Sequence, residues 1–206
     1  MNSLLHIFIA LLVVLDPVGL APMFTALTRG VAADAQRRIA IRGTALATVI
    51  LLVFFFSGDL LLRSLGVSLA ACRVAGGVLL FLLAIDMVFA RQSGLRSTTA
   101  REQREAEHRQ DITVFPLAFP LIAGPGALTT VILMAATNHR PVFVIGMLII
   151  LLVVLGMALV SLLTAARLMR FLGETGTNVI SRLLGVVLAA LAAQFVMDGL
   201  KAGLMN

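Results

Sequence analysis

Apolar residues form six long runs, separated by shorter polar segments. A helix needs about 20 mainly apolar residues to cross the hydrocarbon core of a bilayer. The pattern therefore predicts an all-α integral membrane protein with six transmembrane helices. A membrane β-barrel does not fit, because its strands would be short and would alternate between apolar and polar residues. The runs are Leu4–Leu27, Ile39–Phe56, Leu69–Ala90, Ile112–Ala136, Val142–Ala165 and Val179–Leu200.

Helix-breaking residues interrupt the first and the fourth of these runs. The first contains Asp16-Pro17-Val18-Gly19, and the fourth contains Gly124-Pro125-Gly126. Proline removes a backbone donor, and hydrocarbon holds no water to replace the lost hydrogen bond. Broken backbone at this depth has to line a cavity or be covered by protein. Matching breaks in two halves of a chain point to a transporter's binding site.

Each break predicts a half-helix that begins in the membrane. Asp is a preferred N-cap and Pro a preferred first helical residue, so one half-helix is expected to begin at Pro17. The other is expected to begin at Pro125, with Gly124 in the cap position. Both breaks lie the same number of residues into their runs, roughly 18 Å along a helix axis. That depth is near the middle of a core about 30 Å thick.

The two halves of the chain resemble one another at an offset near 108 residues. Pro17 matches Pro125, Leu65-Gly66 matches Leu172-Gly173, and Arg73-x-x-Gly76 matches Arg182-x-x-Gly185. Each half holds three predicted helices, and an odd number of crossings turns the second copy upside down. The expected arrangement is two inverted repeats in one membrane domain. The repeats are residues 1–90 and 112–206, and residues 91–111 form a cytoplasmic linker.

Composition and charge agree with a membrane protein and add an orientation. The chain has 206 residues, of which 60% are hydrophobic and 13% charged, and its formal net charge is +6. Twelve of the 16 basic residues fall in the first, third and fifth loops, and the other four are Arg63, Arg73, Arg140 and Lys201. The positive-inside rule then places these three loops in the cytoplasm and both termini in the periplasm, across a bacterial inner membrane. The distribution of the positive charge is explained by the orientation of the protein in the membrane, so nucleic acid is not an expected partner.

The breaks are also the candidate binding site. Helix N-termini favour a carboxylate or another anion, and glycine lets a small ligand approach the backbone. An ionised Asp16 would attract an ammonium group, Na⁺ or H⁺, so the expected substrate is a small zwitterion. The alternative is that the breaks are packing kinks and that Asp16 only caps its own helix. The candidate substrate-binding residues are Asp16, Pro17, Gly19, Gly124, Pro125, Gly126 and Thr129.

Asp86 is a second candidate for ion coupling, together with Asp16. Carboxylates inside membrane segments are functional candidates by default. Two interpretations of Asp86 stay open: a proton relay, or an interfacial ion pair with Arg91 or Arg96. No cofactor or metal site is expected, and H⁺ or Na⁺ would be the coupling ion. The chain shows no HExxH, GxSxG or GxGD pattern, so an enzyme is not expected.

Three segments resemble the MarC family of bacterial membrane proteins, also called the neutral amino acid transporter family. The first is Leu15-Asp16-Pro17-Val18-Gly19-Leu20-Ala21-Pro22-Met23-Phe24, and the second, more specific one runs from Phe119 to Thr130. The third runs from Arg182 to Gly199. The family often has Asn where this chain has Leu20. The resemblance covers nearly the whole chain and implies an inner-membrane transporter. Some members of the family move glycine or alanine by ion coupling.

The sequence therefore favours a secondary transporter of small neutral amino acids that works by alternating access at a midplane site. Its partners would be the zwitterionic substrate and the lipid bilayer, and a homo-oligomer is compatible with this interpretation. Two alternatives stay open: an exporter of another small metabolite or drug, and a membrane scaffold that transports nothing.

Overall fold

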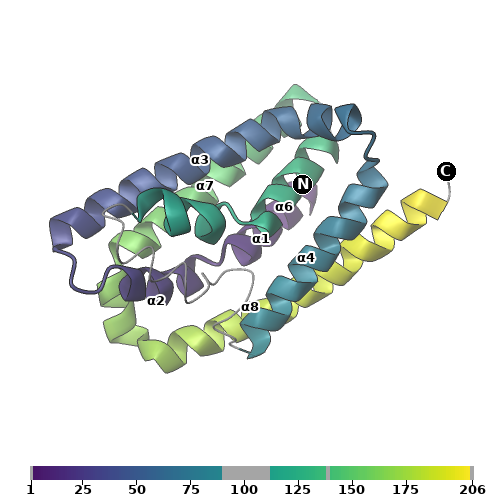
Figure 1. The fold of residues 1–206 in the computed structure, drawn as a ribbon. Coiled ribbons are helices and arrows are strands. Elements are labelled where there is room, and N and C mark those ends of the chain that lie inside the picture. Colours follow the sequence, from purple (N-terminus) through teal and green to yellow (C-terminus); the bar gives the residue numbers. More distant parts are fainter. Residues whose placement is uncertain (1, 90–111, 138–139, 205–206) are drawn as a thin grey trace.

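The computed structural model describes residues 2–89, 112–137 and 140–204, which form helices and connecting turns without strands. Figure 1 shows long helices gathered around the two broken segments. In chain order the elements are α1 (Asn2–Leu15), α2 (Pro17–Leu27), α3 (Ala33–Ser64), α4 (Leu69–Phe89), η1 (Thr113–Ile122), α6 (Pro125–Thr137), α7 (Pro141–Leu163) and α8 (Ala165–Leu204).

The apolar helices are long enough to make this an integral membrane protein. Within the described residues, five helices have the length and composition of a membrane span, and a sixth results if the bent pair η1 and α6 counts as one. The first of these spans, Leu4–Leu27, contains most of α1 and all of α2. The prediction of an all-α membrane protein is confirmed, with five or six candidate spans among the described residues. The exact count of six stays a prediction.

Both predicted breaks are present. α1 ends at Leu15 and α2 begins at Pro17, while η1 ends at Ile122 and α6 begins at Pro125. The axes of η1 and α6 differ in direction by 58°. Each new helix begins at a proline because proline needs no hydrogen-bond partner at the first helical position.

The segment before the second break is not the regular α-helix that was assumed when the depth of this break in the membrane was estimated. η1 is a π-type helix with Pro116 and Pro120 inside it, and Phe115 and Phe119 have extended rather than helical backbone angles. Its hydrogen bonds include Ala123 N–H to the Ala118 carbonyl at 2.9 Å, a five-residue step. Because proline lacks the N–H that an α-helix would use, the backbone hydrogen bonds here join residues five positions apart instead of four. A rise of 1.5 Å per residue therefore does not apply here.

Two long helices also extend beyond their predicted apolar runs. α3 begins at Ala33 and ends at Ser64, so it takes in the polar residues on both sides of Ile39–Phe56. The run Val179–Leu200 lies within α8, which is interrupted at Gly173 with φ 66°. Gly66, its partner in the predicted repeat, has φ 68°. Both glycines take a left-handed conformation that other residues rarely adopt.

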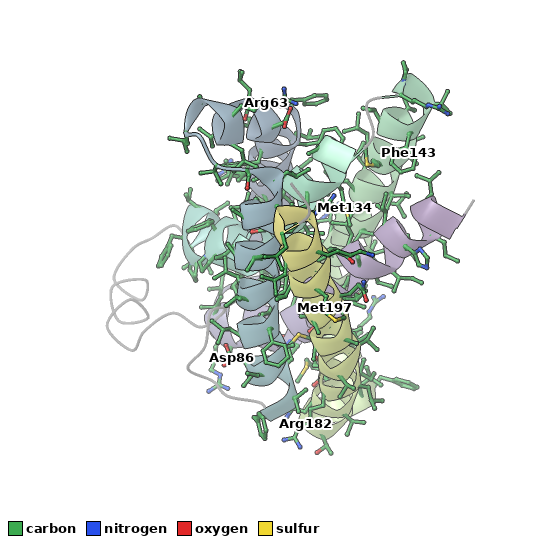
Figure 2. The ribbon with its side chains drawn as sticks, turned by 90° about the vertical axis from the view of Figure 1, so that its right-hand side faces the viewer. Arg63, Asp86, Met134, Phe143, Arg182 and Met197 are labelled. Carbon is green, nitrogen blue, oxygen red and sulfur yellow. The ribbon has the colours of Figure 1, made fainter. Side chains whose placement is uncertain are left out.

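α4 and α8 lie side by side and run in opposite directions (Figure 1). A Cβ atom at Gly77 would lie 2.8 Å from the Ala192 carbonyl oxygen, and one at Gly199 would lie 2.9 Å from that of Ala70. At the opposite end, a Cβ at Gly185 would lie 2.9 Å from Met87 Cβ. Glycine at these positions lets the two backbones approach closely, as small residues do between membrane helices. Figure 2 shows Asp86 and Arg182 toward this second end of the pair.

Candidate functional site

The first break is organised around the side chain of Asp16. Asp16 has a left-handed backbone (φ 45°, ψ 68°), a conformation that Asp adopts more readily than most residues. Its Oδ1 accepts a hydrogen bond from the Gly19 N–H at 3.0 Å, as predicted for an N-cap. Only 1% of Asp16 is exposed. The carboxyl group is therefore held inside the protein at the N-terminus of α2.

Gly19 is required by this arrangement. A Cβ atom at residue 19 would overlap the Asp16 Oδ2 and would lie 2.9 Å from Ser181 Oγ. Real Cβ atoms essentially never approach another atom that closely. The Asp16 carboxyl group and the Ser181 hydroxyl thus occupy the space that a side chain at residue 19 would need. Glycine at this position makes room for these two groups of the protein itself, and not only for a ligand.

Two hydroxyl groups from the second half of the chain reach this break. Ser181 on α8 donates to Asp16 Oδ2 at 3.2 Å, and Ser161 on α7 donates to the Pro17 carbonyl oxygen. Sequence reasoning missed both serines, because a serine in an apolar run gives no sign of where it points. One weak signal was available: Ser181 directly precedes the repeated Arg182-x-x-Gly185 pattern.

The second break carries no polar side chain and borders a narrow recess. A Cβ at Gly124 would lie 2.5 Å from the Pro120 carbonyl oxygen, so only glycine fits the bend. The recess has a volume of about 310 Å³ with its open side included, and its enclosed part admits about one water-sized group. Its lining residues are Val14, Leu79, Leu83, Pro120, Leu121, Ile122, Gly124, Pro125, Gly126 and Ala127.

The two breaks are neighbours in space. Val14, two residues before Asp16, lines the recess. A Cβ at Gly126 would lie 3.7 Å from Val14 Cγ1 and 2.9 Å from Leu80 Cδ2. The end of α1 thus packs against the first turn of α6. Asp16 itself is not among the lining residues of the recess.

Two other predicted residues are not among the lining residues of the recess. The Thr129 hydroxyl donates to the Pro125 carbonyl of its own helix at 2.9 Å, and its methyl group packs where a side chain of Gly76 would be. Asp86 is half-buried on α4, next to Met87. Its predicted partners Arg91 and Arg96 lie outside the described residues, so that alternative remains a prediction.

Comparison with known proteins identifies the family. The model of the "MarC family integral membrane protein" matches residues 1–204, which is nearly the full length of the chain. The chain belongs to the MarC family.

Curated relatives of this MarC protein are similar over their whole lengths. It is 33% identical to "UPF0056 inner membrane protein YhgN" of Escherichia coli K12, with 98% of each chain covered. It is 33% identical to "UPF0056 membrane protein YvbG" of Bacillus subtilis, covering 97% of this chain and 95% of the relative. A relative from Archaeoglobus fulgidus is 35% identical, with 97% and 92% covered. No solved structure matches the MarC chain.

Proposed function

We propose that this MarC protein is an ion-coupled secondary transporter of small neutral amino acids such as glycine and alanine, and that it catalyses no chemical reaction. The substrate would bind at the two breaks and reach either side of the membrane by alternating access. The observation that carries the proposal is the difference between the two breaks: one holds a carboxyl group, and the matching place in the other is a recess.

Inverted repeats are part of the proposal and would make the two breaks equivalent positions. α3 packs on η1 and α6, and α7 correspondingly packs on α1 and α2. α4 packs on α6, and α8 packs on α2. These are the contacts expected if a two-fold axis in the membrane plane exchanges the halves. The left-handed Gly66 and Gly173 also occupy matching positions.

Under this equivalence Gly124 takes the place of Asp16, and Ala127 takes the place of Gly19. In the first break, the Asp16 carboxyl group accepts the Gly19 N–H. In the second break, Gly124 has no side chain that could accept the N–H groups at the start of α6, which a helix cannot pair internally. We propose that the substrate carboxylate binds there, in the place that Asp16 fills in the first copy. Apolar Val14, Leu79 and Leu83 would contact the small side chain and exclude larger ones.

The ammonium group of the substrate would be balanced by an acidic side chain. Asp16 is the proposed acidic group, because it is buried and its segment borders the recess through Val14. Asp86, half-buried on α4, is retained as a second proposed ion-coupling residue. The proposed orientation, with both termini in the periplasm of an inner membrane, rests on the basic loops.

Transport by the purified protein in liposomes tests the proposal. Vesicles loaded with unlabelled alanine should accumulate labelled alanine or glycine by counterflow, and leucine should compete poorly. Asp16→Asn should abolish the dependence on an ion gradient. Asp59→Asn is the matched control, since Asp59 lies near the end of α3 and pairs with Arg63 at 3.0 Å. Absence of flux for every amino acid under Na⁺ and H⁺ gradients would refute the proposal.

A further inference from the structure

A polar pair on α8 has no role in the proposed transport site. The side-chain amide of Gln194 donates to Asp198 Oδ1 at 2.8 Å, one helical turn further along α8. Both residues are exposed, so their side chains point away from the rest of the protein. They lie in the third of the segments that resemble the MarC family. A membrane helix thus presents an amide and a carboxyl group on its outer surface.

Gln194 lies deep in the membrane. α4 has 21 residues, so at 1.5 Å per residue it is about 30 Å long, the thickness of the hydrocarbon core. Gly77 lies about 12 Å along α4 from its first residue, Leu69. A Cβ at Gly77 would lie 2.8 Å from the Ala192 carbonyl oxygen and 2.9 Å from the Val196 nitrogen. Gln194 is midway between these two residues, so it is also about 12 Å from that end of the span.

Hydrocarbon leaves the amide of Gln194 incompletely paired. Its bond to Asp198 uses one of two N–H groups, and within the described residues the second N–H and the carbonyl oxygen make no hydrogen bond. Polar groups at this depth normally face protein, because lipid chains offer them no partner. The outward faces of α4 and α7 show the usual pattern, with apolar side chains such as Val78, Phe81 and Ile149. The outward face of α8 therefore needs a partner that α4 and α7 do not.

Gln194 belongs to a continuous row of exposed residues along α8. Steps of four and three residues alternate along this α8 row, which is the spacing of the contact line between two helices in a left-handed coiled coil. Figure 2 shows α4 and α8 on the near side of the molecule, with Met197 on α8. Only 17% of the most apolar part of α8 is buried, compared with 33% for α4. The α8 row consists of Leu183, Val187, Ala190, Gln194, Met197, Lys201 and Leu204.

We propose that the α8 row is a dimer interface, at which α8 of a second copy of this chain packs. Two copies with the same orientation in the membrane are related by a two-fold axis along the membrane normal, so their α8 helices run parallel. In a parallel pair each residue of the row faces its counterpart. The free N–H of each Gln194 would then donate to the carbonyl oxygen of the other Gln194. Both amides would be fully paired, each with its own Asp198 and with the second copy.

The chemistry of the α8 row favours a second copy over a different protein. An amide is both donor and acceptor, so Gln194 is complementary to itself, whereas two like charges would repel one another. Asp198 lies beside the row rather than on it. Lys201 is level with Ala70 in the first turn of α4, where its long side chain can reach the lipid headgroups. The small Ala190 allows close approach of the two helices.

Disulfide crosslinking of the full-length protein in bacterial membranes tests the interface. Cys72 is the one cysteine of the chain, so Cys72→Ser gives a cysteine-free background. Ala190→Cys and Met197→Cys should each give a covalent dimer on oxidation, because facing residues lie within the Cα separation of about 6 Å that a disulfide needs. Val153→Cys is the matched control. Val153 is exposed to a similar extent as Met197 but lies on α7, so this variant should stay monomeric.

Self-association in liposomes tests the role of Gln194. Energy transfer between labelled copies, measured as the protein is diluted with lipid, gives the protein-to-lipid ratio at which half of the dimers dissociate. Gln194→Leu should raise this ratio roughly tenfold, because it removes the hydrogen bonds between the copies. Val153→Leu should leave it unchanged. Leucine suits an outward position in a membrane, so an unchanged melting curve in detergent should show that Gln194→Leu is folded.

Three results would overturn the interface. The first is a monomer at every lipid content. The second is crosslinking at Val153 but not at Ala190 or Met197, or dimerisation that Gln194→Leu leaves unchanged. The third is crosslinking of Ala190→Cys and Met197→Cys to another membrane protein alone, which would assign the α8 row to that protein. None of these measurements uses amino-acid flux, so the interface and the transport proposal can fail separately.

Discussion

Replacing Gly19 by Ala tests the geometry of the first break most directly. The new methyl group would overlap the Asp16 Oδ2 and lie 2.9 Å from Ser181 Oγ, so the carboxyl group has to move away from the Gly19 N–H. Loss of a hydrogen bond to a charged group costs about 1.5–3 kcal/mol. Overpacking adds about 1–3 kcal/mol, and the better helix propensity of Ala returns about 1 kcal/mol. The expected decrease in the free energy of unfolding is therefore about 1.5–5 kcal/mol.

The assay is reversible unfolding of the purified protein in mixed micelles, with SDS as denaturant and circular dichroism as the signal. Gly156→Ala is the control of opposite sign. Gly156 is inside α7, and among the described residues no side chain and no other helix lies within 4 Å of a Cβ built there. That variant should therefore gain up to about 1 kcal/mol. Combining Gly19→Ala with Asp16→Ala should restore much of the loss, since the largest overlap disappears. A Gly19→Ala protein as stable as Gly156→Ala would refute the reasoning.

Three further changes test other parts of the structure. Gly124→Ala places a methyl group 2.5 Å from the Pro120 carbonyl, so it should lower alanine counterflow at least tenfold, whereas Gly156→Ala should leave the rate within twofold. Thr44→Val removes a buried hydroxyl without a hydrogen-bond partner in the described part of the chain, so it should raise the free energy of unfolding by about 1 kcal/mol; a less stable variant would mean that the hydroxyl is used. With a periplasmic C-terminus, alkaline phosphatase fused after Asn206 should be active in bacterial cells, and green fluorescent protein fused at the same position should not fluoresce. The reverse result would overturn the proposed orientation.

The breaks could be predicted because they depend on local chemistry. Asp16 is an N-cap and Pro17 a first helical residue whatever surrounds them, and the structure places α2 accordingly. Pro125 begins α6 for the same reason. The same logic identified the apolar spans, because the bilayer imposes a length on any helix that crosses it.

Tertiary contacts explain what could not be predicted. Ser161 and Ser181 join the break from positions more than 140 residues away, and their direction depends on how α7 and α8 pack. The extended backbone at Phe119 has a local cause instead, because the proline that follows disfavours helical backbone angles at Phe119. The polar first turns of α3 lie outside any apolar run, so a hydropathy pattern starts this helix too late.

Packing across the two halves has a consequence for how the protein is made. Gly43 on α3 abuts Leu117 of η1, Gly58 on α3 abuts Ile132 of α6, and Gly146 on α7 abuts Leu4 of α1. The helices that α3 chiefly packs against, η1, α6 and α7, all belong to the second half of the chain, so Gly43 and Gly58 are not covered while only the first half exists. We therefore expect α3 to stay incompletely packed in the bilayer until the second half of the chain has been made. Two half-length polypeptides made in the same cell should accumulate only together.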